Sequence, residues 1–591
     1  MVETKNAIDP ITAQVVNGAL KNVAIEMGHK LARMAYSSII RESNDFGCAL
    51  MDENGQQLCE SVNSTPLQSG PIPGYLQGIR EIMAERGDDF KPGDVILHNS
   101  AFYGATHQPD CGFFVPIYYK GELIGFSGAT AHQLDLGALS PGSIGIIDAV
   151  DCFAEGLQFK AIKVYEEGKK VDMVWQLIRD NVRDSKVIGD MEAEIATCRI
   201  GAQRYLEIVE KFGLDTVRAA RDYMIDYSER VLRNEIAKIP DGTYHSEGYI
   251  DGYLDSPDPK RKDLKFVVNL TVKGDDMIVD LTGTSDQVED RPINMPFPGT
   301  TDMAVYLTIR TILLDSKRFG YIPQNAGMIR PIKIIAPEGT LANPTYPAPT
   351  ISRFCPGNAL ADTIMHALGQ AVPNQICAGI GNLYMVAYSG MIDKKYWVYM
   401  DIMAGSSGGR YEKDGIDAID VLYANTRNNP IEDIESHHPL SVTKYEFPDN
   451  AAAPGKYRGG VGPIRDIEFT DEGGFSVEGE GQKYAPWGFD GGHDGTPSKL
   501  IFHDAEGNET SLPSKVPYKK THKGETLRIV GPCGGGYGDP YERGPEKVLN
   551  DFHDGYVSLE RAASDYGVVI TNNEIDWEKT KKLRDTHKIK G

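Results

Sequence analysis

The sequence predicts an α+β protein with a helical and mixed N-terminal part, a β-rich part with mixed sheets and a helical C-terminus. Residues 10–36 and 214–239 repeat apolar side chains at three- and four-residue spacing, the pattern of amphipathic helices. Residues 241–290 instead alternate apolar and polar side chains, as half-buried antiparallel strands do. The approximate parts are 1–240, 241–540 and 541–591, and the sequence leaves open whether they share one core.

The chain has 591 residues, enough for about two to four domains of ~150 residues each. Its 41% hydrophobic and 25% charged residues are typical of a globular protein. The formal net charge of −23 argues against a nucleic-acid partner, because phosphate backbones bind basic surfaces. No apolar run reaches the roughly 18 residues of a membrane-crossing helix, so we expect no membrane association.

The N-terminus and the cysteines predict a cytoplasmic location. The opening MVETKNAIDP has neither the basic start nor the apolar core of a signal peptide. The eight cysteines include no C-x-x-C pair, and in a long chain this scatter is typical of reduced thiols rather than of a disulfide framework.

The first helix is predicted to begin at Asp9-Pro10, because aspartate supplies an N-cap and proline a pre-set φ at the first helical position. It ends near Tyr36. Residues 46–51 form a short apolar run, and a turn joins them to a returning strand at 57–59. Further helical patterns cover 74–86, 173–212 and 214–239.

Beyond residue 240 the chain is predicted to be mainly β-structure with a few helices. Gly274-Asp-Asp is a hairpin turn between two alternating segments. Apolar helices are predicted at 301–314 and 357–372, and glycine-rich strands at 376–422 and 445–538. The last 50 residues return to helix, with Ser558 as the N-cap of LERAASDYG.

The stretch from His98 to Ser143 contains the strongest candidate site. Two apolar runs divided by Lys-Gly-Glu predict a β-hairpin, with His107 and Asp110 at one end and His132 at the other. The intervening Pro109 disfavours helix, so we place the His-x-x-Asp pair on a loop at the mouth of the hairpin. Imidazole nitrogen and carboxylate oxygen suit zinc, manganese or iron better than calcium or magnesium.

Two carboxylates extend this candidate metal site, and each has a plainer interpretation. Asp45 opens an apolar strand and is a possible fourth ligand, but it could equally pair with Arg41 or cap a turn. Asp135 is a candidate hydrogen-bond partner for a ligand imidazole. The His-x-x-Asp spacing is itself common, and a second histidine across the hairpin strengthens it.

Other motifs favour structural roles. The run from Gly531 to Pro540 lacks the Lys-Ser/Thr of a phosphate-binding loop and is interpreted as a tight turn. Ser406 lacks the G-x-S-x-G context of a nucleophile. The pair His437-His438 is interpreted as a surface or packed pair.

Many motifs in order make the chain resemble the hydantoinase B/oxoprolinase family over nearly its whole length. They include DPITAQVVNGAL, RESNDFGCALMD, GATHQPD, AHQLDLGALSPGS, GLQFKAIKVYEEGK, IRDNVRDSKVIGDMEAEIATCRIG, the run from Asn425 to Pro439, GKYRGGVG and CGGGYGDPYERGPEKVLNDFHDGYVSLERAASDYGVV. The resemblance implies a subunit of an ATP-dependent complex that either opens cyclic amides or carboxylates ketones.

The resemblance also implies a division of labour. A separate hydantoinase A-type subunit, with smaller subunits in some complexes, would bind ATP and phosphorylate the substrate. This chain would hold a divalent metal, zinc or manganese, on the ligands that the family motif assigns: Asp45, His107, Asp110 and His132. Asp135 is the candidate general base for a hydrolytic reaction.

Two departures from the family pattern favour ketone carboxylation of the acetophenone type. Asn99-Ser-Ala-Phe stands where ring-opening members usually have Asn-Asp-Pro-Tyr, and Gln133 stands where a second histidine is common. The alternative is a cyclic amidohydrolase acting on hydantoins, oxoproline or lactams. A third interpretation, of another class, is a non-catalytic scaffold subunit with a structural metal.

Overall fold

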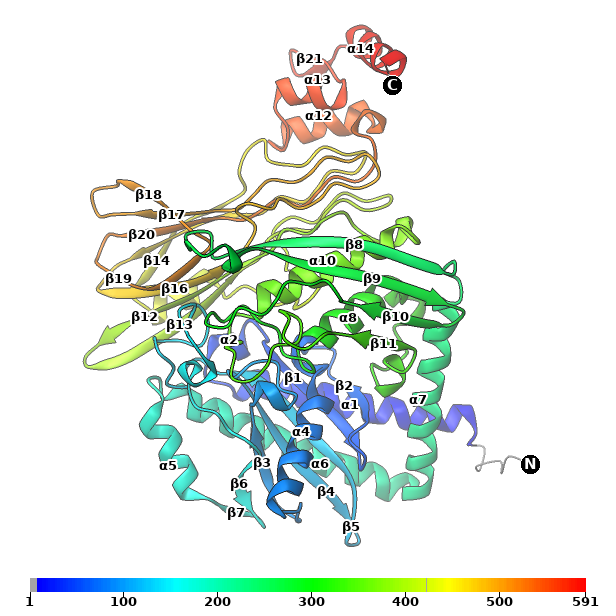
Figure 1. The fold of residues 1–591 in the computed structure, drawn as a ribbon, viewed down its shortest axis with the longest axis vertical. Coiled ribbons are helices and arrows are strands. Elements are labelled where there is room, and N and C mark those ends of the chain that lie inside the picture. Colours follow the sequence, from blue (N-terminus) through cyan, green and yellow to red (C-terminus); the bar gives the residue numbers. More distant parts are fainter. Residues whose placement is uncertain (1–7, 421, 591) are drawn as a thin grey trace.

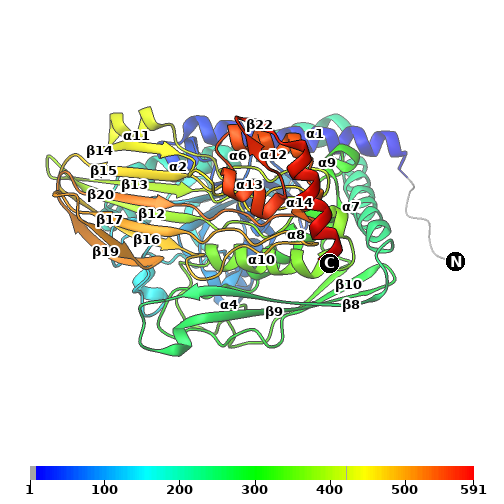
Figure 2. The same cartoon turned by 90° about the horizontal axis from the view of Figure 1, so that it is seen from above.

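The computed structural model describes residues 8–420 and 422–590 and confirms the α+β class (Figure 1). A seven-stranded sheet with helices on both faces occupies the N-terminal part. A second sheet with two helices follows it, then two sheets of a β-sandwich, and three helices near the C-terminus project from one end (Figures 1 and 2).

The seven-stranded sheet has the order β2-β1-β5-β4-β3-β6-β7, and all its neighbouring strands are antiparallel. Its strands are β1 (Phe46–Asp52), β2 (Gln57–Glu60), β3 (Val95–His98), β4 (Asp110–Tyr119), β5 (Glu122–His132), β6 (Ile162–Glu166) and β7 (Lys169–Lys170). Helices α1 (Pro10–Met34) and α6 (Lys186–Phe212) cover one face, and α4 (Ile72–Arg86) covers the other.

Burial on both faces explains why β1 is a continuous apolar run. Cys48 and Leu50 belong to the apolar cluster that includes α1 and α6, whereas Ala49 and Met51 belong to the cluster around α4. Alternate residues point to opposite faces of a strand, so a sheet covered on both sides needs apolar residues at every position. The predicted hairpin is also present, since β4 and β5 pair with Asp110 opposite His132.

The helices between 173 and 236 differ in one detail from the sequence pattern. The prediction of an unbroken helical pattern over 173–212 was wrong, because the structure has α5 (Asp172–Asn181) and α6 separated by a short turn. Val182 has an extended backbone, and the Asp184 carboxylate accepts a hydrogen bond from Lys186 N at 2.9 Å. This side-chain bond satisfies a backbone donor in the first turn of α6. Helix α7 (Leu214–Ile236) follows.

The second sheet has the order β11-β10-β9-β8 and packs against α8 (Thr301–Leu313) and α10 (Phe354–Gly369). Its strands are β8 (Gly242–Gly252), β9 (Lys262–Lys273), β10 (Asp276–Asp280) and β11 (Ile332–Ile335). The predicted turn at Gly274 is present, with φ at +64°. Helix α10 begins three residues before its predicted start, and this places Arg353 at its N-cap.

The sandwich consists of two sheets that share one apolar cluster. One is β13-β12-β16-β19, comprising β12 (Tyr384–Ile392), β13 (Lys395–Met403), β16 (Gly473–Gly479) and β19 (Lys515–Thr521). The other is β14-β15-β20-β17-β18, comprising β14 (Leu440–Glu446), β15 (Ile464–Phe469), β17 (Lys499–His503), β18 (Glu509–Leu512) and β20 (Thr526–Val530).

Glycine-rich loops lie between the sandwich and the C-terminal helices (Figure 1). Gly534 approaches the backbone of Ser407, and Gly459 approaches that of Gly534, each too closely for a β-carbon. These contacts fit the interpretation of the glycine run as a structural loop. Beyond it lie β21 (Ile570–Thr571), β22 (Glu574–Ile575), α12 (Pro545–His553), α13 (Leu559–Tyr566) and α14 (Trp577–Lys590).

The largest apolar cluster runs from Ala13 to Ala424 and so includes residues on both sides of position 240. The remaining short helices are α2 (Ser38–Arg41), α3 (Pro66–Ser69), α9 (Ser316–Phe319) and α11 (Ile431–His437). Among the described residues, none of the helices has the length and apolar character required to cross a membrane. All eight cysteines are free thiols.

Candidate metal centre

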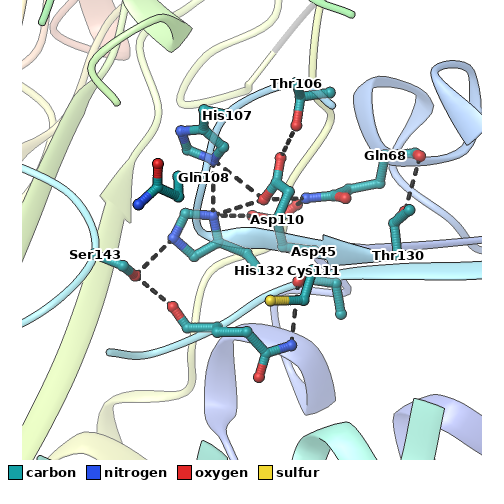
Figure 3. A network of polar contacts seen from close by, with 12 residues as sticks. Asp45, Gln68, Thr106, His107, Gln108, Asp110, Cys111, Thr130, His132 and Ser143 are labelled. Carbon is teal, nitrogen blue, oxygen red and sulfur yellow. Dashed lines mark hydrogen bonds and ion pairs between the residues drawn. The ribbon is translucent and has the colours of Figure 1, made fainter. Parts of the chain in front are cut away.

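The candidate site lies where β1, β4 and β5 come together at one end of the seven-stranded sheet (Figure 3). Asp110 is the first residue of β4 and stands opposite His132, the last residue of β5. His107 lies on the turn that leads into β4. Asp45 directly precedes β1, whose Phe46 pairs with Ala131. The hairpin and its neighbouring strand therefore gather four residues that are distant in sequence.

Three of the four predicted ligands place their donor atoms together. His107 Nε2 lies 3.3 Å from His132 Nδ1 and 3.1 Å from Asp110 Oδ1, and His132 Nδ1 lies 2.9 Å from the same oxygen. All three side chains are buried. Tetrahedral bonds of ~2.1 Å separate neighbouring ligand atoms by about 3.4 Å, so this spacing fits a bound divalent cation.

Hydrogen bonds on the outer side of each imidazole assign its tautomer. His107 Nδ1 lies 2.8 Å from the carbonyl oxygen of Ile351, which can only accept, so Nδ1 carries the proton. The Ser143 hydroxyl donates to the carbonyl of Gln133, which leaves its oxygen to accept from His132 Nε2 at 2.9 Å. In these tautomers the neutral rings would turn the lone pairs of His107 Nε2 and His132 Nδ1 toward each other and toward Asp110.

Asp110 is held as a carboxylate beside these lone pairs. It accepts hydrogen bonds from Gln68 Nε2 at 2.8 Å, from the Thr106 hydroxyl and from Arg353 Nη2 at 2.7 Å. Although burial opposes ionisation, His107, His132 and Arg353 hold the pKa of Asp110 well below its usual range. A bound cation would take the place of the imidazole protons in the contacts with Asp110 Oδ1 and hold the three side chains together through the same atoms.

Asp45 lies beside this triad at a greater distance. Its Oδ2 is 4.0 Å from His132 Nδ1, and its Oδ1 accepts from Gln68 Nε2 at 3.1 Å. Burial raises the pKa of its carboxyl group. The alternative pairing with Arg41 is not realised, because that guanidinium binds Glu42 and Asp433 instead. Asp45 thus lies next to the cluster of His107, Asp110 and His132 without belonging to it.

The triad opens onto a small cavity of about 10 Å³, about the volume accessible to one water molecule. Besides Asp45, His107 and His132, Arg353 is its only charged or polar wall. The apolar wall is formed by Ile39, Ile144, Phe354, Met385, Met400 and Ile402. This lining would keep bulk water away from a reacting group beside the donor atoms.

Among the described residues, the Asp135 carboxylate forms no hydrogen bond to the triad. Oδ1 accepts from Gly137 N and Arg183 N at 2.9 and 3.0 Å, and Oδ2 accepts from Gly142 N and Arg183 Nη1 at 3.1 and 2.9 Å. These four donors hold the buried side chain of Asp135 in place. Asp135 therefore secures the loop that contains Ser143.

The residues that led to the carboxylase expectation form no side-chain hydrogen bond to the triad in the described part of the chain. Gln133 follows His132 and faces the other way, with its Nε2 donating to Glu194 Oε1 in α6 at 2.7 Å. Ser100 and Ala101 form no hydrogen bond to the triad in the described chain.

Several residues that support the site were not identified from the sequence. Thr106 and Ser143 lay within the stretch singled out, but nothing in their spacing marked them. Gln68, Arg353 and the Ile351 carbonyl come from distant segments, and Arg353 is 243 positions from Asp110. Local spacing carries no signal for such partners, and only the fold brings them together.

The chain is similar to known proteins in sequence and in fold. The B component of a putative D-/L-hydantoinase from Pseudomonas sp. (strain NS671) is 64% identical over 580 residues, which cover 98% of each chain. The crystal structure of the ATP-dependent caprolactamase from Pseudomonas jessenii matches with a TM-score of 0.87 at 26% identity, covering 98% of this chain and 100% of that one.

A nucleotide-free acetone carboxylase structure also has a TM-score of 0.87, covering 98% of this chain and 83% of that one. Its identity is 18%, so that likeness shows the fold alone. The family model described as hydantoinase B/oxoprolinase matches residues 9–540. Because this match spans most of the chain and agrees with the motifs found in the sequence, the chain belongs to the hydantoinase B/oxoprolinase family.

Proposed function

We propose that this chain is the metal-bearing B-type subunit of an ATP-dependent cyclic amide hydrolase that opens hydantoins. The observation that carries the proposal is the convergence of two imidazole nitrogens and one carboxylate oxygen from buried side chains beside a cavity. The substrate class follows the 64% identical relative, which is described as a component of a putative D-/L-hydantoinase. An ATP-dependent caprolactamase, another relative by structure, acts on the same kind of bond.

His107, Asp110 and His132 would hold the metal, with Asp45 as the fourth ligand. Two nitrogens with carboxylate oxygens suit zinc or manganese. When bound, such a cation supplies Lewis acidity toward the amide carbonyl. The Ile351 carbonyl and the Ser143 hydroxyl keep the imidazoles in the ligating tautomer, and Gln68 and Thr106 orient the carboxylates.

Ring hydrolysis now replaces ketone carboxylation as the preferred reaction. The carboxylase expectation depended on Gln133 and on the Asn99-Ser-Ala-Phe segment. The Gln133 side chain binds Glu194 rather than the triad, which removes the physical reason for treating it as a determinant of the reaction. The scaffold alternative is disfavoured because structural zinc sites are usually closed and rich in cysteine, whereas this triad has no cysteine and borders a cavity.

A partner subunit is part of the proposal. The relatives are named as the B component of a hydantoinase and the beta component of a caprolactamase, and such names point to a hetero-oligomer. The sequence lacks a phosphate-binding loop, so we assign ATP binding mainly to a hydantoinase A-type subunit, with smaller subunits as further components. The free cysteines support a cytoplasmic location for this chain.

The test is to assemble the chain with its A-type partner and to measure ATP hydrolysis and product formation together. A hydantoin should stimulate both activities, and a lactam or 5-oxoproline provides the comparison within the class. Asp110→Asn should abolish ring opening while the complex still assembles. Stimulation by acetophenone with bicarbonate, and by none of the cyclic amides, would restore the carboxylase. Full activity of Asp110→Asn would instead support the scaffold.

A further inference from the structure

Arg353 is a buried cation beside the proposed metal ligands. It stands at the N-cap of α10, and only 1% of its side chain is exposed. Its Nη2 donates to Asp110 Oδ2 at 2.7 Å. The same side chain lines the cavity onto which His107 and His132 open.

The guanidinium of Arg353 is only partly satisfied. Nε and Nη1 are buried and have no hydrogen-bond partner among the residues that the structure describes. Burial raises the pKa of the nearby Glu478 carboxyl group and the charge of Arg353 lowers it, yet no hydrogen bond joins the two side chains. Leaving donors of a charged group unpaired in the interior is costly, so the site is built to receive an acceptor.

The charge of the unpaired donors shows which kind of acceptor fits. Nε and Nη1 belong to a guanidinium cation, and hydrogen bonds between a charged donor and an anionic oxygen are stronger than those between neutral groups. An anionic oxygen group in the cavity would therefore supply the missing acceptor.

We propose that Arg353 binds an oxyanion of the substrate next to the metal, so that the centre accepts an anionic form of the cyclic amide. The inference rests on the proposed function and narrows its substrate class. A planar guanidinium presents parallel N–H groups that match phosphoryl or carboxylate oxygens. A phosphoryl group could come from ATP-dependent activation, and a carboxylate from the opened ring.

The cavity must widen to admit such a group. Its volume of about 10 Å³ is no larger than a water molecule needs. Met385 and Met400 form part of the wall, and unbranched methionine side chains change rotamer easily. The occupant would thus displace these side chains rather than the strands that carry the ligands.

The experiment loads the full-length chain with Co²⁺ and follows its visible spectrum during titration with inorganic phosphate and, separately, with acetate. We expect at least one anion to perturb the spectrum of the wild type. Arg353→Met should weaken that anion about 10- to 100-fold, the effect of losing charge-assisted hydrogen bonds. Arg353→Lys should bind the anion with intermediate affinity, because lysine keeps the positive charge but lacks the parallel N–H groups of the guanidinium.

Controls separate anion binding from folding. Arg465→Met removes another arginine that is 1% exposed and has unpaired nitrogens, but this arginine pairs with Asp401 in the sandwich. It should leave the titration unchanged. Cobalt content and the melting temperature are measured for every variant. If Arg353→Met does not retain cobalt, the anion affinity of Arg353→Lys is compared with that of the wild type instead.

Each outcome has a defined meaning. A response to phosphate supports an activated phosphorylated substrate, and a response to acetate supports carboxylate binding. The inference is overturned if neither anion perturbs the spectrum of the wild type. It is also overturned if both Arg353 variants bind the anion with the affinity of the wild type. The spectra report anion binding without turnover. The anion-binding inference can therefore be wrong while the chain still supports hydantoin hydrolysis, and it can be right if the chain does not hydrolyse hydantoins.

Discussion

His107 donates from Nδ1 to the carbonyl oxygen of Ile351 at 2.8 Å, although the two residues are 244 positions apart. The peptide that bears this carbonyl is itself held by Glu155. Its Oε1 accepts from the backbone N–H groups of Thr350 and Ile351, the latter at 2.7 Å. A buried carboxyl group thus fixes the segment that fixes the imidazole.

Glu155→Gln tests the ionisation of this support. Burial raises the pKa of Glu155 from 4.5 to about 8, so the folded chain binds the proton more tightly than the unfolded chain. The stability of the wild type should therefore fall between about pH 4.5 and pH 8, by at most about 1.4 kcal/mol per pH unit. Glutamine does not titrate and keeps the accepting oxygen.

Melting temperatures of both proteins across this pH range, in the presence of a chelator, measure the difference. The melting temperature of the wild type should fall relative to that of Glu155→Gln as the pH rises. Parallel curves for the two proteins would show that the pKa of Glu155 is not raised by folding.

Removal of His107 should release the metal. Loss of an outer partner of a metal ligand alone costs about 10- to 100-fold in affinity, so we expect His107→Ala to lose more than 100-fold. Metal content after dialysis and the assembly of the complex are the measurements. His98→Ala is the matched control, because His98 is equally buried but binds the Tyr103 carbonyl outside the triad. Equal metal content in the two variants would contradict the ligand assignment.

Asp135→Asn distinguishes a structural carboxylate from a general base. Asparagine would turn an amide group toward Gly142 N and Arg183 Nη1, which are themselves donors. We expect a loss of about 2–4 kcal/mol in stability with metal and kcat retained. A fall in kcat of about 10²- to 10⁴-fold at an unchanged melting temperature, with loss of one limb of the pH profile, would instead identify a base.

Gly47→Ala should disturb the metal site indirectly. A β-carbon at Gly47 would lie 2.6 Å from the backbone of Gln68 and Ser69, and Gln68 orients both Asp45 and Asp110. We expect a destabilisation of about 1–3 kcal/mol and weaker metal binding. Gly18→Ala is the control. Apart from the backbone of helix α1 itself, no described atom lies within 4 Å of its added carbon, and there alanine should stabilise by about 0.5–1 kcal/mol. Metal titration and thermal melts report both effects.

Local patterns predicted much of the fold. Asp9 caps α1 through Thr12 N at 2.9 Å, as the Asp-Pro pair predicts, and the hairpin of β4 and β5 follows its two apolar runs. Spacing alone could not locate the break between α5 and α6. The break depends on an extended Val182 and on a side-chain bond from Asp184, and neither interrupts the apolar periodicity.

The sequence by itself determined the family, the α+β class and the four residues proposed as metal ligands, because motifs, periodicity and donor chemistry are properties of short segments. Only the tertiary structure decided how far Asp45 lies from the triad, which tautomer each imidazole adopts, and that Asp135 and Gln133 face other partners. It also placed Arg353 in the cavity. These features depend on contacts between separate segments, up to 244 positions apart, which local residue patterns do not encode.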